Sequence, residues 1–90
     1  MPLTPKERQH LKGLAHKLKP VVMVGNNGMT DAVNKEVDRA LNDHELIKIR
    51  IQSQDREVRT ALFTAICEAA SAELVQKIGS IGVLYRKRMK

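Results

Sequence analysis

The sequence has 90 residues, 42% of them hydrophobic and 29% charged, which is typical of a single packed domain over residues 1–90. One cysteine excludes an internal disulfide and a multi-cysteine zinc site, and the apolar runs are too short to span a membrane. Sixteen Lys and Arg against ten Asp and Glu give a formal charge of +6 at pH 7, which favours an anionic partner.

The first predicted element is a helix that begins at residue 5 and ends near residue 18. Thr4, Pro5 and Glu7 form a capping box with proline at the first helical position. Pro20 disfavours helical conformation in the residue before it, so the helix ends there. Its apolar residues share one face at helical spacing: Leu11, Leu14, Ala15 and Leu18.

Residues 21–24 are all apolar, which predicts a central strand buried on both faces. A sharp turn at residues 25–28 ends this strand, and Thr30 is the expected N-cap of a second helix that closes at residues 42–44. The inward side chains of this helix are Val33, Val37, Ala40 and Leu41.

From residue 45 the apolar period changes to two, which predicts a half-buried strand with a basic outer face. Its inward residues are Ile47, Ile49 and Ile51, and its outward residues are Lys48, Arg50 and Gln52. Asp55 is the expected cap of a third helix, which is followed by a strand over 74–78, a turn over 79–82 and a last strand over 83–86.

This order, α-β-α-β-α-β-β, predicts a compact two-layer α/β domain with a mixed four-stranded sheet. Strand–helix–strand crossovers are right-handed, so the second and third helices share one face of the sheet. The charge is uneven along this chain: residues 1–20 carry +4, residues 21–76 carry −3 and residues 77–90 carry +5. If the two basic ends meet, the molecule is polarised and suits nucleic acid or an anionic membrane surface; a solvated surface is the plainer alternative.

No residue pattern indicates an enzyme, a metal site or a cofactor. The three serines lie in no nucleophile-elbow motif, and Cys67 falls near the apolar face of the third helix, as a buried structural thiol does. His10 and His16 fall on different faces of the first helix, and His44 has only acidic close neighbours in sequence. Acidic residues at the start of the third helix are expected from the helix dipole alone.

The sequence Gly25-Asn26-Asn27-Gly28 joins a strand to a helix and is a candidate phosphate-binding loop. Its glycines permit close approach of a ligand, and its N–H groups, with those of the next helix, can point at a phosphate. Nucleotide fingerprints are absent, whereas a GxxG loop contacts the backbone in some small RNA-binding folds. Asn-Gly is equally an ordinary turn dipeptide, and Asp31 would partly repel a phosphate.

Phe63 and Tyr85 are the only aromatic residues, so stacking of several bases is not available. Phe63 is expected in the core, which leaves Tyr85 as the one candidate for stacking. A binder of this composition depends on backbone contacts and shape, and structured RNA fits that description.

Four segments closely resemble the CRM domain (chloroplast RNA splicing and ribosome maturation), and the length resembles the stand-alone bacterial YhbY type. They are residues 11–16 (LKGLAH), 18–30 (LKPVVMVGNNGMT), 44–49 (HELIKI) and 78–86 (IGSIGVLYR). The resemblance implies a compact α/β fold similar to the C-terminal domain of a bacterial translation initiation factor. It also implies RNA binding, association of bacterial members with precursors of the large ribosomal subunit, and RNA contact through the GxxG loop.

We therefore expect a monomeric, cytoplasmic RNA-binding protein that engages structured ribosomal RNA and assists large-subunit assembly. The expected loop contacts are Gly25, Asn26, Asn27 and Gly28. The expected basic surface consists of Arg8, Lys12, Lys17, Lys19, Arg86, Lys87 and Arg88. If the family fold holds, we expect the two basic ends to converge around the glycine loop. The alternative is a basic module that docks on an acidic protein or an anionic membrane, because the first helix has both basic and apolar faces.

Overall fold

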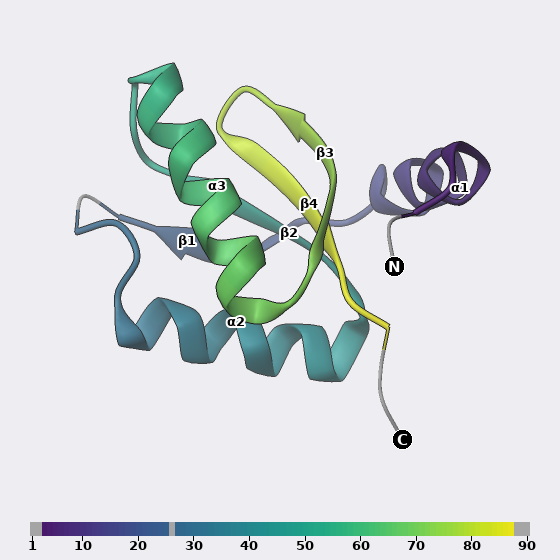
Figure 1. Ribbon diagram of the computed structural model, residues 1–90, viewed down its shortest axis with the longest axis horizontal. Helices are drawn as coiled ribbons and strands as arrows, with labels where there is room; N and C mark the ends of the chain where they lie inside the picture. Colours follow the sequence, from purple (N-terminus) through teal and green to yellow (C-terminus); the bar gives the residue numbers. More distant parts are fainter. Residues whose placement is uncertain (1–2, 26, 88–90) are drawn as a thin grey trace.

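The structure is a computed structural model that describes residues 3–25 and 27–87. Its elements are α1 (Pro5–Ala15), β1 (Pro20–Val24), α2 (Asp31–His44), β2 (Leu46–Ile51), α3 (Arg56–Ala70), β3 (Glu73–Ile78) and β4 (Ile81–Tyr85). The predicted element order and the mixed four-stranded sheet are confirmed (Figure 1). Within the described part of the chain, no helix has the length and apolar character needed to cross a membrane.

The helices begin at the predicted capping residues. The Thr4 hydroxyl accepts from the Glu7 N–H while the Glu7 carboxylate accepts from the Thr4 N–H, which completes the capping box. Thr30 caps α2 in the simpler one-way manner, and the Asp55 carboxylate accepts from two N–H groups at the start of α3. Helix α1 ends at Ala15, earlier than expected, because the chain turns there through a hydrogen bond from the Leu18 N–H to the Ala15 carbonyl.

The sheet has the strand order β1-β2-β4-β3, with β1 parallel to β2 and the other neighbours antiparallel. The prediction that residues 21–24 form a central strand buried on both faces was wrong, because β1 is an edge strand. Val22 and Val24 are buried, whereas Val21 and Met23 are 54% and 51% exposed. Helix α1 packs over β2 and β3, so it leaves the outer face of β1 open to solvent.

Two hydrophobic clusters lie on opposite faces of the sheet. Helices α2 and α3 cover one face together, as predicted, and bury Leu41, Phe63 and Ile66 against the inward residues of β2. Helix α1 covers part of the other face, where Leu11 and Ala15 pack on Val75 and Val83. Because successive strand residues point to opposite faces, β4 serves both clusters. Helix α1 thus adds a partial third layer to the two expected.

The loops at one end of the sheet gather the segments on which the function depends. The β1–α2 and β2–α3 loops meet where the Gln52 N–H donates to the Val24 carbonyl at 2.8 Å. The β3–β4 turn joins them through the Ile51 N–H, which donates to the Ser80 carbonyl at 2.9 Å. We name Gly25 and the segments 27–30, 52–55 and 79–80 the loop end. The start of α1 and the end of β4 lie at the opposite end (Figure 1).

Candidate functional site

The candidate loop is a tight turn in which the Gly28 N–H donates to the Gly25 carbonyl at 3.0 Å. Gly28 has a φ of 69°, a conformation that L side chains rarely adopt, so the turn itself requires glycine there. Gly25 differs, because a Cβ on it would meet only Gln52 Oε1, at 4.0 Å. Nothing in the described parts of the chain therefore requires glycine at 25, whose bare backbone is exposed to an external ligand. Asn27 is exposed beside it, and Asn26 lies outside the described residues.

Several N–H groups that we expected to bind a phosphate instead donate hydrogen bonds to acceptors within the protein. The Gly28 N–H closes the turn, and the Val33 N–H donates to the Thr30 hydroxyl at 3.2 Å. The Asn34 N–H donates to the Thr30 carbonyl. The loop and the first turn of α2 thus offer fewer donors than expected, and the exposed Asp31 lies in that same turn. The loop therefore allows close approach of a ligand's backbone but does not by itself provide a complete anion-binding site.

Two cavities flank residues 52–54 at the loop end. One, of about 460 Å³, lies against the glycine loop and is lined by Gly25, Asn27, Gly28, Gln52, Ser53, Gln54, Val58 and Leu62. The other, of about 470 Å³, is lined by Arg50, Ile51, Gln52, Ser53, Gln54, Arg59, Gly79 and Ser80. Neither lining contains a carboxylate or an aromatic ring. Both cavities are therefore suited to an anionic backbone rather than to stacked bases.

Arg50 and Arg59 were not among the expected site residues. Alternation placed Arg50 on the outer face of its strand, but nothing in the sequence indicated that β2 ends beside the glycine loop. Arg59 lies on α3 and reaches back to the β2–α3 loop, where Nη1 donates to the Ser53 carbonyl at 2.7 Å. A helical residue four positions after a cap has no distinctive sequence signal for such a contact.

The expected N-terminal basic residues occupy different environments. Lys17 and Lys19 are exposed between α1 and β1, and Lys12 lines a cavity between α1 and the sheet together with Lys48. Arg8 is half-buried, and its Nη1 donates to the Leu74 carbonyl at 2.6 Å and the Val75 carbonyl at 3.0 Å. The Arg8 guanidinium therefore links α1 to β3, a structural role that the sequence did not indicate.

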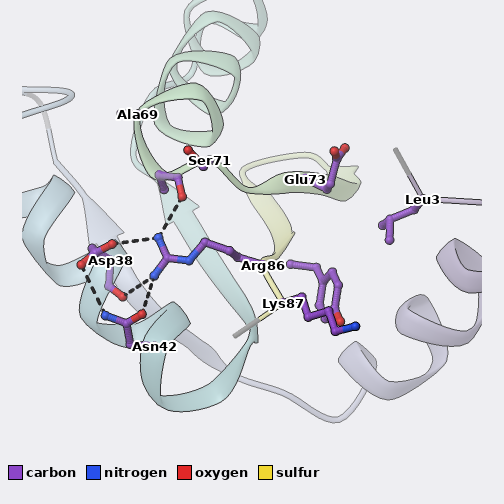
Figure 2. A pocket seen from close by; sticks show the side chains of 10 residues that line it. Leu3, Asp38, Asn42, Ala69, Ser71, Glu73, Arg86 and Lys87 are labelled. Atoms are coloured by element: carbon purple, nitrogen blue, oxygen red, sulfur yellow. Dashed lines mark hydrogen bonds and ion pairs between the residues drawn. The ribbon is translucent and has the colours of Figure 1, made fainter. Parts of the chain in front are cut away.

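Arg86 likewise joins three elements, as Figure 2 shows. Its guanidinium forms an ion pair with the Asp38 carboxylate at 2.8 Å and donates to the Asn42 side-chain oxygen at 2.8 Å. It also donates to the backbone carbonyls of Ala70, at 2.8 Å, and of Asp38, at 3.0 Å. With its side chain only 19% exposed, Arg86 holds β4 against α2 and α3.

The expectation that both basic ends converge on the glycine loop was wrong. Lys17 and Lys19 precede the start of β1, whereas the glycine loop follows its end, and the described C-terminal basic residues also lie away from the loop. Tyr85 pairs with Leu46 at the start of β2, whereas the glycine loop adjoins the end of β2. Lys87 is exposed and lines a cavity together with Leu3, so the first and last described residues lie near each other, at the end of the sheet away from the loop. Antiparallel pairing of β4 with β2 explains this placement. Arg88 lies outside the described residues.

Cys67 is buried in the larger hydrophobic cluster, as expected of a structural thiol. Burial, with a smaller contribution from the negative charge of Glu73, raises its pKa to about 11. The thiolate is the nucleophilic form of cysteine, so this side chain is protonated and unreactive near neutral pH. Across residues 3–25 and 27–87, no group of three or more His, Cys, Asp or Glu side chains is placed to hold a metal.

Comparison with known proteins finds similar sequences and a similar structure along almost the whole chain. The sequence model of the CRS1 / YhbY (CRM) domain matches residues 3–86. A Haemophilus influenzae protein named "RNA-binding protein" is 51% identical over 84 residues, which cover 93% of this chain and 85% of that protein. A Pseudomonas aeruginosa protein named "Probable RNA-binding protein" is 43% identical over 90 residues, which cover 100% of this chain and 86% of that protein. The solution structure of a hypothetical protein from Staphylococcus aureus matches with a TM-score of 0.86 at 34% identity. The match covers 98% of this chain and 92% of that protein.

Proposed function

Because this chain belongs to the CRS1 / YhbY (CRM) domain family, we propose that it is an RNA-binding protein that engages structured ribosomal RNA through the loop end. RNA binding is supported by the names of its relatives in Haemophilus influenzae and Pseudomonas aeruginosa. The proposal extends to a cytoplasmic, monomeric protein that assists assembly of the large ribosomal subunit by binding its precursor. This finer role is the one that the family resemblance in the sequence implies.

The observation that carries the proposal is the exposed backbone of Gly25 beside a cavity whose described lining contains no acidic residue. A side chain at 25 would have room within the protein, so its absence matters to whatever approaches from outside. The polar side chains that line the two cavities at the loop end are amides, hydroxyls and two arginines, and Ile51, Val58 and Leu62 contribute apolar side chains. An RNA backbone is a polyanion that a bare peptide can approach closely, which makes it a suitable partner for this surface.

The position of the aromatic residues favours structured RNA over an unpaired sequence. Phe63 is fully buried, and Tyr85 lies at the opposite end of the sheet from the glycine loop. Recognition of single-stranded RNA depends on aromatic rings that stack on bases, and the cavity linings at the loop end contain none. Contacts to phosphates and to the shape of a folded RNA remain as the mode of recognition.

The matched variants Gly25→Asp and Gly25→Asn test this proposal in a gel shift with precursor large-subunit RNA. Both add a side chain of nearly the same size at a position with room for it, but only aspartate adds a negative charge. We expect Gly25→Asp to bind about tenfold more weakly than Gly25→Asn, because a carboxylate there repels a phosphate. Equal affinity of the two variants would rule out RNA contact at the loop.

One observation supports the alternative function, docking on an anionic membrane or an acidic protein: the outer face of β1 is open to solvent. The exposed Val21 and Met23 lie beside the outward Lys48 and Arg50 of β2, which combines apolar and basic side chains on one surface. Sedimentation with phosphatidylglycerol vesicles, run beside the RNA gel shift, separates these functions. Vesicle binding without RNA binding would favour the alternative.

A further inference from the structure

One buried nitrogen of the Arg59 guanidinium has no hydrogen-bond partner among the described residues. Nη1 donates to the Ser53 carbonyl, but Nε is buried and, in the described parts of the chain, makes no hydrogen bond. Buried donors are almost always paired in folded proteins, because an unpaired one loses its bonds to water without replacement. The Nε–H group therefore invites an acceptor that the protein itself does not supply.

The cavity beside Arg59 has the composition of an anion site. Arg50 enters it from the end of β2, the amides of Gln52 and Gln54 line it, and the turn at 79–80 contributes the Ser80 hydroxyl. No carboxylate lines the cavity, and the one ion pair among the described residues, Arg86–Asp38, is elsewhere. Two arginine charges therefore face the same space without neutralisation.

The nearest acidic residue in sequence does not serve as the missing partner. The Asp55 carboxylate accepts from the N–H groups of Glu57 and Val58, so it is engaged in capping α3. A purely structural role of Arg59, as a link to the β2–α3 loop, explains why Nη1 donates to the Ser53 carbonyl. It explains neither the unpaired Nε nor the presence of Arg50 in the same cavity.

We propose that Arg50 and Arg59 form a seat for one backbone phosphate of the bound RNA. One phosphate oxygen accepts from the Arg59 guanidinium and the other accepts from the Arg50 guanidinium, while the glutamine amides flank the group. The seat shares residues 52–54 with the cavity beside the glycine loop, so a strand that passes Gly25 continues into it. This inference rests on the proposed function, and it names which residues hold the backbone.

Substitution of each arginine by glutamine tests the seat, with Arg39→Gln on α2 as the matched control. Arg39 is exposed and lines none of the cavities described above, so its variant measures the effect of losing one positive charge. We expect Arg50→Gln and Arg59→Gln to bind precursor RNA about tenfold more weakly, and Arg39→Gln about as well as the parent. The slope of log affinity against log salt should also flatten by about one unit in the two seat variants only.

The outcomes separate this inference from the proposed function. If Gly25→Asp weakens RNA binding while the two seat variants match Arg39→Gln, the seat is overturned and the RNA-binding loop stands. If the parent itself binds no structured RNA, the proposed function fails first. The Arg50 variant guards against a folding artefact, because the Arg50 side chain is exposed and makes no hydrogen bond within residues 3–25 and 27–87.

A direct readout in the unmodified protein is the Nε–Hε signal of Arg59 in a ¹⁵N NMR spectrum. Added RNA should shift this signal and slow its exchange with solvent, while the Arg39 signal stays in place. Phosphatidylglycerol vesicles form a second arm, because a lipid headgroup offers the same phosphate chemistry. No change on RNA addition, or a change with vesicles alone, would overturn the inference.

Discussion

The ring of Phe63 packs directly against the backbone of Gly82. A Cβ atom on Gly82 would lie 2.7 Å from Cδ1 of that ring and would also clash with Cε1. Phe63 is fully buried on α3, and Gly82 lies in β4 between Ile49 and Lys77 on the neighbouring strands. The missing side chain lets α3 place its largest residue on the middle of the sheet.

Gly82→Ala should therefore destabilise the fold by about 2 to 3 kcal/mol, since the ring must move from a packed position. Urea unfolding measures this change. Gly13→Ala is the matched control, because a Cβ at 13 meets nothing within 4 Å on a helix and should be neutral or stabilising. If Gly82→Ala and Gly13→Ala change the free energy of unfolding equally, the packing of the Phe63 ring does not require glycine at 82.

Arg86 should matter for stability even when its charge is kept. Lysine at 86 preserves the charge but cannot reach Asp38, Asn42 and the Ala70 carbonyl together, so Arg86→Lys should cost about 2 kcal/mol in urea unfolding. Lys87→Gln, at the exposed neighbour, should change the free energy of unfolding by less than about 0.5 kcal/mol. If Arg86→Lys is as stable as the parent, the network in Figure 2 does not hold β4 in place.

Cys67 should resist alkylation while the protein is folded. With the pKa of this thiol near 11, about one molecule in a thousand carries the thiolate at pH 8. Iodoacetamide labelling followed by mass spectrometry should be slow in buffer and fast in concentrated urea. Rapid labelling of the native protein would contradict the buried, protonated state.

The capping box should make part of the stability dependent on pH. Hydrogen bonds from the backbone N–H and the hydroxyl of Thr4 lower the pKa of Glu7 below the usual 4.5. A carboxylate whose pKa is lowered by folding stabilises the fold above its unfolded pKa, and this contribution is lost as the pH falls through the folded value. The free energy of unfolding, measured between about pH 5 and about pH 3, should therefore fall less steeply with decreasing pH in Glu7→Gln than in the parent. Identical pH profiles would exclude a role for the Glu7 charge.

Local signals in the sequence were enough to predict the element order. Thr4, Thr30 and Asp55 each cap the predicted helix, because an N-cap depends on residues adjacent in sequence. The change of apolar period at residue 45 likewise predicted β2 and its inward isoleucines. The turn at 79–82 was only partly correct, since β4 begins at Ile81. Gly82 suggested a turn, but it is required by a ring from α3.

Contacts between distant residues could not be predicted in this way. An apolar run such as 21–24 does not indicate whether its strand lies at the edge or the centre of a sheet. Arg86 had the sequence character of a free surface charge, and only the packing of β4 on α2 brings it to Asp38. Arg59 depends in the same way on where α3 begins relative to β2. The glycine loop itself was evident from the sequence, but the groups around it were not.

Crosslinking of the protein to precursor large-subunit RNA, with the crosslinked peptides identified by mass spectrometry, locates the RNA-binding surface directly. If RNA binds at the loop end, crosslinks should concentrate at Gly25 and in residues 27–30 and 50–59, which meet there in the fold. Crosslinks confined to the opposite end of the sheet, at the start of α1 and residues 85–87, would contradict the account.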